Sequence, residues 1–328
     1  MFNRSRILWS RLWRSRSNCK VLPVNSYRNA FAKKGNTAIT YTVGFSLFTW
    51  LGFEKKLIAE DDLIITIKHC ILFIQNKEYA KAEQLLHVAL RQAQQINHKL
   101  GITYIYDVMA NLALEREELD KAKQLFVAVT QRIMADGATE NDPRVVHISA
   151  KLARISHLKK EYSTAQLGYE WCLEKAKTVM DVNADSTAKK FLAVLEDWYG
   201  RLFLDCNQNE QGLLLMVSAL DLMREVPEIE QEHIVVQLND IGTVCDKLGK
   251  FDESISYFKE AITLGKKLNM DDLGAMYVNL GRAYLKMNLI EEARKSCGYG
   301  WKLGVLGKNN EIKLEAESCL TEIKNNIL

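Results

Sequence analysis

From about residue 60 onward, apolar side chains recur at the three- and four-residue spacing of amphipathic helices. Within this pattern one signature repeats. A small residue in one helix is followed twelve positions later by a small residue in the next helix, and four positions further by an aromatic or aliphatic residue. The clearest copy is Gly242, Ser254 and Phe258. Small side chains at paired positions let two helices approach closely, so the pattern predicts a series of helical hairpins.

Six copies of the small-residue pair follow one another along the chain, and their first members lie 39 to 47 residues apart. The pairs are Cys70 and Ala82, Ala110 and Ala122, Ala153 and Ala165, Gly200 and Gly212, Gly242 and Ser254, and Gly281 and Ala293. After the last hairpin, residues 309–328 carry one apolar stripe, which is typical of a helix that caps a repeat array. We therefore predict an all-α fold, a right-handed superhelix (α-solenoid) of six hairpins over residues 60–308 with a C-terminal cap helix over 309–328.

These spacings resemble the tetratricopeptide repeat, in which paired helices stack and small and aromatic residues fill the contacts. The usual repeat has about 34 residues, so most hairpins here carry extended helices or connections. The resemblance implies a concave groove lined by the first helix of each hairpin, with binding as the function. The groove positions in this sequence are Tyr104, Asp107, Asn111, His147, Arg154, Asp197, Arg201, Asn239, Arg282 and Lys286.

The predicted groove mixes positive and negative side chains. We expect charge reversal at Arg154 and Arg201 to weaken partner binding with little effect on stability, because exposed charges usually contribute little to folding. For any single residue of the set, an ordinary solvated helix face is the alternative interpretation. Some tetratricopeptide domains clamp acidic chaperone tails with a particular arrangement of Lys and Asn. This chain departs from that arrangement, because Asp107 stands where a Lys is needed beside Asn111.

Composition supports long helices, since 3 prolines and 17 glycines among 328 residues leave little material for turn-dense sandwiches or barrels. The charge is uneven along the chain. Residues 1–34 carry nine Lys and Arg and no acidic residue, and the first acidic residue is Glu54. Without those nine, 35 basic residues stand against 41 acidic ones. This balance disfavours general nucleic-acid binding by the folded part.

The N-terminal region has the composition of a targeting segment. Residues 1–36 combine arginines and serines with an apolar helical stripe, and they resemble a mitochondrial presequence with a basic leader. A basic tail that contacts nucleic acid is the alternative. Residues 37–53 carry no charge and lie between lysine pairs at 33–34 and 55–56. We interpret 37–53 as a single transmembrane or membrane-associated segment, with a buried or interfacial helix as the alternative.

The first helix of the repeat region, within residues 61–75, is apolar nearly all round. An unshielded apolar helix at the end of the array suggests docking on lipid or on a partner protein. Packing against residues 54–59 is the alternative interpretation.

Residues that could carry chemistry form no recognised motif. The seven cysteines, at 19, 70, 172, 206, 245, 297 and 319, lack the spacing of a zinc site or a disulfide framework. We interpret most of them as small buried hydrophobes. The HExxH, GxSxG and GxxxxGK[ST] motifs are absent. We therefore predict no catalytic residue, no metal, no cofactor and no small-molecule substrate.

Residues 104–126, preceded by 82–93 and followed by 168–172, are similar to mitochondrial tetratricopeptide repeat proteins that support respiratory complex III. The resemblance covers roughly residues 60–325. It implies attachment to the mitochondrial inner membrane, binding of respiratory complex III subunits, and support of that complex. The implied role includes clearance of Rieske iron–sulfur protein fragments and involves no nucleic acid. Three alternatives stay open: an organellar RNA-binding helical repeat, a hydrolase acting on complex III fragments, and a general protein-interaction adaptor.

Overall fold

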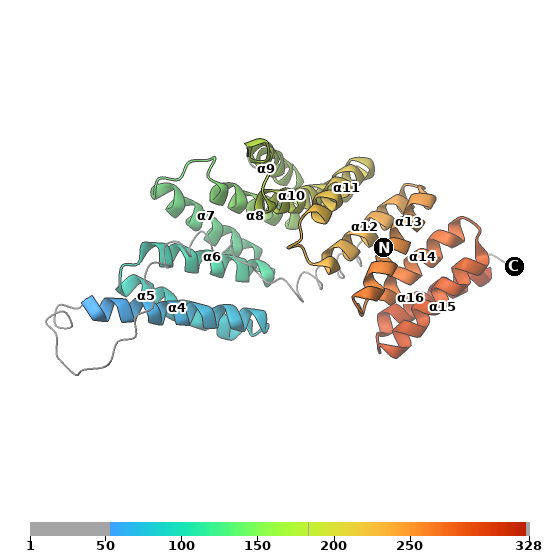
Figure 1. Ribbon diagram of the computed structural model, residues 1–328, viewed down its shortest axis with the longest axis horizontal. Helices are drawn as coiled ribbons and strands as arrows, with labels where there is room; N and C mark the ends of the chain where they lie inside the picture. Colours follow the sequence, from blue (N-terminus) through green and yellow to red (C-terminus); the bar gives the residue numbers. More distant parts are fainter. Residues whose placement is uncertain (1–52, 183, 326–328) are drawn as a thin grey trace. The chain divides into compact units, whose positions relative to one another are not determined.

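The computed structural model describes residues 53–182 and 184–325. Every regular element in this part of the chain is an α-helix (Figure 1). In order, the helices are α4 (Phe53–Gln75), α5 (Tyr79–Gln95), α6 (Lys99–Glu115), α7 (Leu119–Ala135), α8 (Pro143–Leu158), α9 (Tyr162–Val182), α10 (Ser186–Asp205), α11 (Asn209–Glu225), α12 (Gln231–Lys247), α13 (Phe251–Lys267), α14 (Leu273–Lys286), α15 (Ile290–Leu306) and α16 (Asn310–Asn325). The predicted all-α fold of helical hairpins with a final capping helix is confirmed.

The helices fall into two compact units that divide after Lys159. Helices α4–α8 belong to an N-terminal unit and helices α9–α16 to a C-terminal unit. The sequence analysis treated residues 60–308 as one repeat domain. Its third hairpin, which contains Ala153 and Ala165, has one helix in each unit.

The predicted presequence and leader, residues 1–36, lie outside the described residues. The predicted membrane segment, 37–53, does so too, except that Phe53 begins α4. None of the helices α4–α16 combines the length and the apolar composition that crossing a membrane requires. Helix α4 corrects one alternative interpretation. Residues 54–59 continue the same helix as residues 61–75, so they do not fold back over its apolar face.

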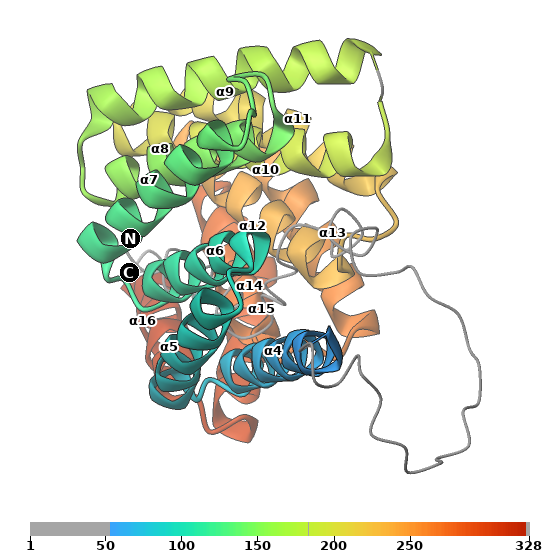
Figure 2. The same cartoon turned by 90° about the vertical axis from the view of Figure 1, so that its left-hand side faces the viewer.

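The N-terminal unit is held together by apolar side chains between successive helices. Helix α4 packs beside α5, and α6 beside α7 (Figures 1 and 2). Leu63 of α4, Leu86 of α5 and Ile105 of α6 share one buried cluster. Phe126 of α7 and Ile148 of α8 belong to the next. Because each helix buries residues spaced three or four apart, the amphipathic stripes read from the sequence become the contacts between helices.

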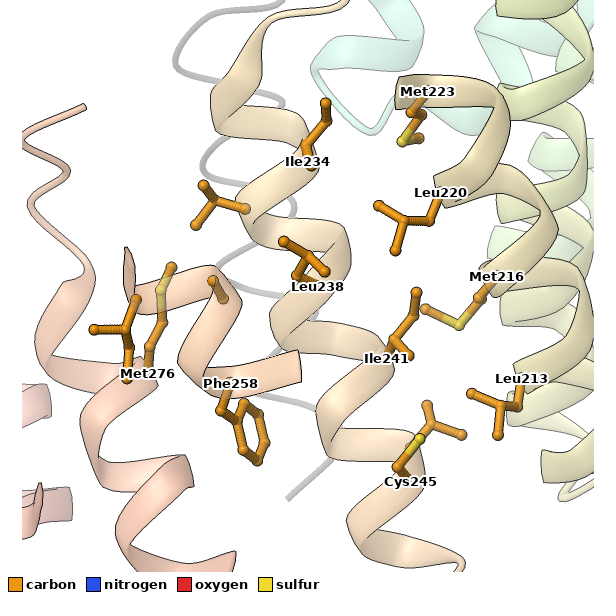
Figure 3. Packing of buried hydrophobic residues seen from close by; sticks show 14 of the residues in the cluster. Leu213, Met216, Leu220, Met223, Ile234, Leu238, Ile241, Cys245, Phe258 and Met276 are labelled. Carbon is orange, nitrogen blue, oxygen red and sulfur yellow. The ribbon is translucent and has the colours of Figure 1, made fainter. Parts of the chain in front are cut away.

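The C-terminal unit contains a large apolar cluster that extends from α10 to α14. Figure 3 shows Met216 and Leu220 of α11 directed towards Leu238 and Ile241 of α12. Phe258 of α13 extends the cluster on the other side of α12. The buried face of α12 is therefore wide, because this helix contacts a neighbour before it and a neighbour after it in the chain.

The small residues of the repeated signature lie where paired helices approach each other. A Cβ atom added to Gly212 would lie 2.8 Å from the carbonyl oxygen of Gly200. The Ser254 Oγ donates a hydrogen bond of 2.8 Å to the carbonyl oxygen of Gly242. A Cβ atom at Gly242 would lie 2.8 Å from the ring of Phe258. These contacts confirm that small side chains at both positions let the two helices of each hairpin approach closely.

The turns after many of the helices use one backbone motif. After α4, the N–H of Lys77 donates to the carbonyl of Ile74 at 2.9 Å, and the N–H of Glu78 donates to that of Phe73 at 2.8 Å. Lys77 has a φ of 61°, which completes a Schellman motif and satisfies the last carbonyls of the helix. The same pattern follows α12, where Gly249 has a φ of 77°. Such turns end helices without proline.

The cysteines partly follow the interpretation made from the sequence. Cys70, Cys172 and Cys245 are buried and form no disulfide. The interpretation needs correction for the other three described cysteines. Position 206 carries an exposed thiol, and positions 297 and 319 form a disulfide between α15 and α16, with Cα atoms 6.1 Å apart. The two bonded cysteines are 22 residues apart and meet only when the helices pack.

Candidate partner-binding surface

The ten residues predicted to line a groove lie on the first helices of the hairpins. These are α6 and α8 in the N-terminal unit and α10, α12 and α14 in the C-terminal unit. Within each unit, we call the side of these helices that carries the predicted residues the first-helix face. Asp107, Asp197 and Asn239 are buried. The face is therefore partly closed, and the contacts of each residue decide whether it can meet a partner.

Arg201 on α10 lies at the centre of a buried polar cluster that joins α10 to α12. Its Nε donates to Oδ1 and Oδ2 of Asp197 at 3.1 and 3.0 Å, one turn earlier on the same helix. Its Nη2 donates to Oδ2 of Asp240 at 2.9 Å and to Oε1 of Gln237 at 3.3 Å. The Arg201 side chain is only 15% exposed. The expectation that its charge can be reversed with little effect on stability is therefore wrong.

The carboxylates of Asp197 and Asp240 share this one guanidinium. Burial raises the pKa of Asp240 to about 6, against the lowering effect of Arg201. Burial by itself would lower the pKa of Arg201, but the charges of Asp197 and Asp240 hold it above its ordinary value. Arg201 is thus permanently charged and fully engaged inside the molecule. The cluster links two hairpins and leaves Arg201 unavailable to a partner.

Similar polar links connect α12 to α14. The Nδ2 of Asn279 on α14 donates to Oδ1 of Asn239 on α12 at 3.0 Å. The Nζ of Lys286, near the end of α14, donates to Oδ2 of Asp246 on α12 at 2.5 Å. The Lys286 side chain stays 46% exposed. Asn239 therefore serves the contact between helices, whereas Lys286 keeps an accessible charge.

Arg282 connects α14 to the capping helix. Its Nη1 donates to Oε2 of Glu315 on α16 at 2.9 Å, and its Nη2 lies 3.5 Å from Oε1 of Glu322. The Arg282 side chain is 16% exposed. The guanidinium of this predicted groove residue therefore joins α14 to α16 instead of facing solvent.

In the N-terminal unit, Lys151 of α8 completes a link to α6 that the sequence analysis did not identify. Its Nζ donates to Oδ1 of Asn111 at 2.8 Å and lies 3.9 Å from Oδ1 of Asp107. The Nδ2 of Asn111 donates to the carbonyl of Asp107 at 2.7 Å. The Lys151 ammonium also lies 5.1 Å from the ring centroid of Phe126. Asp107 and Asn111 are thereby joined to the next hairpin.

The remaining predicted residues of the N-terminal unit are half-buried. Tyr104 packs against the cluster shared by α4, α5 and α6. Burial, with a smaller effect from Lys151, lowers the pKa of His147 to about 3, so this imidazole is neutral near pH 7. Arg154 donates from Nη1 to Nδ1 of His157 at 3.1 Å on the same helix. Arg154 is half-buried, whereas Arg201 lies inside the polar cluster of α10 and α12.

The residues missed by the sequence analysis are the partners that complete these links, namely Lys151, Gln237, Asp240, Asp246, Asn279, Glu315 and Glu322. Their spacing is a signal that could have found several of them. Arg201 and Asp240 are 39 residues apart, and Lys286 and Asp246 are 40 apart. Polar partners one hairpin apart lie on neighbouring first helices. Mapping each hairpin by itself does not reveal such pairs.

The described residues do not form a metal site. In the described ranges 53–182 and 184–325, three or more His, Cys, Asp or Glu side chains nowhere gather in a way that could hold a metal ion. The absence of catalysis stays a prediction from the sequence.

The paired helices, the small-residue contacts and the polar links one hairpin apart define this chain as a tetratricopeptide repeat protein. The profile of the tetratricopeptide repeat family matches residues 238–266 and 274–297. Among solved structures, the apo form of RapI is similar with a TM-score of 0.61 at 11% identity. The match covers 83% of this chain and 84% of RapI. That likeness shows the fold.

Relatives in sequence define the family more narrowly. A Drosophila melanogaster protein, "Tetratricopeptide repeat protein 19 homolog, mitochondrial", is 36% identical over 301 residues, which cover 91% of this chain and 82% of the relative. The Homo sapiens "Tetratricopeptide repeat protein 19, mitochondrial" is 30% identical over 268 residues, which cover 78% of this chain and 70% of the relative. The chain belongs to the tetratricopeptide repeat protein 19 family. The resemblance seen in the sequence is confirmed.

Proposed function

We propose that this chain is a non-enzymatic protein-interaction scaffold in mitochondria. In this proposal it binds respiratory complex III and supports its assembly or maintenance, including clearance of fragments left from processing the Rieske iron–sulfur protein. The observation that carries the proposal is the relation to a mitochondrial relative over 91% of the chain. The fold supports it as well, because stacked helical hairpins present extended surfaces to protein partners.

We assign the partner contact to side chains of the first-helix face that stay accessible after the internal links have formed. Lys286 keeps nearly half of its side chain exposed. Arg154 is only half-buried, although it contacts His157 on its own helix. Arg201 is left out because the carboxylates of α10 and α12 already surround it. The accessible charges on this face are the ones a partner can contact.

An RNA-binding helical repeat is the second candidate from the sequence, and the first-helix face argues against it. Attraction of nucleic acid depends on cations that can neutralise phosphates. Here Lys151, Arg201 and Arg282 each face carboxylates within the protein. The charge of these three residues is therefore already neutralised within the protein.

Co-purification from mitochondria tests the scaffold proposal. The full chain, tagged at its C-terminus, is expressed in cells that lack it, and complex III subunits in the eluate are quantified. Lys286→Glu and Arg154→Glu should lower their yield. Lys267→Glu, at an exposed lysine of the second helix α13, should leave the yield unchanged. Recovery of RNA without complex III would reject the scaffold, and equal recovery with all three variants would reject the assigned surface.

We also propose that residues 1 to about 30 are removed on import and that residues 37–53 attach the protein to the inner membrane. The acid-free basic leader and the uncharged segment support this. N-terminal sequencing of the mitochondrial protein and extraction with carbonate test the two parts. An intact Met1 would contradict removal, and release of the protein by carbonate would contradict a membrane-spanning segment.

A further inference from the structure

The disulfide between Cys297 of α15 and Cys319 of α16 lies where three helices meet. Both residues have no exposed surface. On the α14 side, a Cβ atom at Gly281 would collide with the Cys297 Sγ, so the glycine leaves the space that this sulfur occupies. The other buried members of the cluster are Val278, Ala293, Ala316 and Ile323. The bond is thus enclosed by α14, α15 and α16.

Helix α16 docks through one stripe of buried side chains, Ile312, Ala316, Cys319 and Ile323. Two of the four side chains around the disulfide are alanines, which contribute less area than Leu or Ile. On the opposite side of α16, Leu314 and Ser318 are exposed. A capping helix that packs on one side only separates from its neighbours more readily than an internal helix does. A covalent bond to α15 therefore adds to the apolar contacts and to the Arg282 ion pairs that keep α16 in place.

We propose that Cys297 and Cys319 form an oxidation site at which a thiol–disulfide oxidoreductase fastens the capping helix. The thiolate of one cysteine attacks the disulfide of the oxidoreductase, which forms a mixed disulfide and releases one enzyme thiol. The thiolate of the second cysteine attacks the mixed disulfide, which closes the Cys297–Cys319 bond and leaves the enzyme as a dithiol. Two electrons and two protons pass from the cysteine pair to the enzyme sulfurs.

Burial decides when this step takes place. With α16 docked, neither sulfur can be reached, so oxidation precedes the docking of α16. Afterwards a soluble reductant reaches the bond only when α16 detaches. The disulfide is therefore a durable closure. The free cysteines differ, because burial raises the pKa of the Cys70 and Cys245 thiols to about 11 and keeps them as unreactive thiols.

The bond also bears on the compartment in which the repeats fold. Disulfides persist in oxidising compartments and are rare where thiol reductants are abundant. This step rests on the mitochondrial location proposed above. Given that location, the bond assigns helices α9–α16 to the intermembrane space instead of the matrix.

Sequential thiol labelling of the full protein tests the oxidation site. Mitochondria are dissolved in denaturant that contains one maleimide, which labels cysteines present as thiols. After excess reagent is removed, the protein is reduced, and a second maleimide of different mass labels the cysteines that were in a disulfide. Peptide mass spectrometry should find the second label on Cys297 and Cys319. The buried thiols Cys70 and Cys245 are the matched controls and should carry the first label. The first label on Cys297 and Cys319 would overturn the proposal.

A second measurement tests the role in fastening α16. Reductant that has been given time to act should lower the Tm of the wild-type protein by roughly 5 to 10 °C. It should leave the Tm of the Cys297→Ala/Cys319→Ala double variant unchanged. The Cys70→Ala variant, which removes a buried thiol outside the disulfide, should keep the response to reductant. An equal response of the wild-type protein and the double variant would overturn the fastening role.

Protease added to mitoplasts tests the compartment. The oxidised repeats should be digested without dissolving the inner membrane, and protection would overturn the assignment to the intermembrane space. These results are separable from those of the scaffold experiment. If the second label is found on Cys297 and Cys319 but complex III is absent from the eluate, the proposed function is rejected and the oxidation site stands. If complex III is recovered but both cysteines carry the first label, the oxidation site is rejected and the proposed function stands.

Discussion

Arg201 on α10 donates a hydrogen bond of 2.9 Å to Asp240 on α12, a residue 39 positions further along the chain. The contact places a guanidinium between carboxylates of two successive hairpins. Lys151 and Asn111 make a comparable link between α8 and α6 in the N-terminal unit. The first-helix face is thus a set of polar links between hairpins as well as a candidate surface for a partner, and the two roles are distinguishable by stability measurements.

Replacement of Arg201 by Ala should lower the free energy of unfolding by about 3 to 5 kcal/mol, because Asp197 and Asp240 would stay buried without their cation. Urea unfolding followed by circular dichroism measures the change. Lys286→Ala is the matched control, since its partly exposed ion pair with Asp246 should contribute less than about 1 kcal/mol. Similar small losses for both variants would show that Arg201 is not a buried link.

Stability should depend on pH through Asp240, whose pKa is raised to about 6 from an ordinary 3.8. Between these values the folded state binds the proton more tightly than the unfolded state. The contribution of this group to stability is therefore present at low pH and falls as pH rises towards 6. Relative to Asp240→Asn, the wild-type protein should lose up to about 3 kcal/mol between pH 4 and pH 6.5.

The comparison with Asp240→Asn is made by urea unfolding of both proteins at several pH values. Other carboxylates, such as Glu83, have lowered pKa values and act in the opposite direction, but they are common to both proteins. A difference in stability that does not change with pH would refute a raised pKa at Asp240.

Gly242→Ala should destabilise the C-terminal unit by about 1 to 3 kcal/mol, because the added Cβ would lie 2.8 Å from the Phe258 ring in a close-packed contact. Gly298→Ala is the control within another helix, α15. Nothing lies within 4 Å of a Cβ atom at Gly298, so alanine should stabilise that helix by about 0.5 to 1 kcal/mol. Chemical unfolding gives both values, and the same sign for both would contradict the packing argument.

The Schellman turns predict opposite effects for two substitutions at left-handed positions. Lys77 has a φ of 61°, so Lys77→Gly should relieve backbone strain and raise stability by up to about 1 kcal/mol. Gly249 has a φ of 77° and nothing within 4 Å of a Cβ atom, so Gly249→Ala should cost about 1 kcal/mol through the backbone alone. Thermal unfolding measures both. Destabilisation by Lys77→Gly would show that the lysine side chain, not its backbone strain, governs the turn.

The sequence contained enough information for the helices and for their pairing within hairpins. Gly242, Ser254 and Phe258 could be recognised because close approach of two helices needs small residues at a fixed separation, and that separation is set by one hairpin. Apolar periodicity identified the helices for the same reason, since a helix repeats its face every three to four residues. Such short-range constraints are visible along the chain.

What only the tertiary structure decided is which polar and sulfur-containing side chains meet. Arg201 looks like a solvent-facing arginine on one helix, and it becomes a buried link because α12 brings Asp240 and Gln237 against it. Cys297 and Cys319 look like two isolated thiols until α15 and α16 pack. Helical periodicity specifies the direction of a side chain from its own helix. The approach of the next helix, determined by packing along the whole hairpin, specifies what lies in that direction.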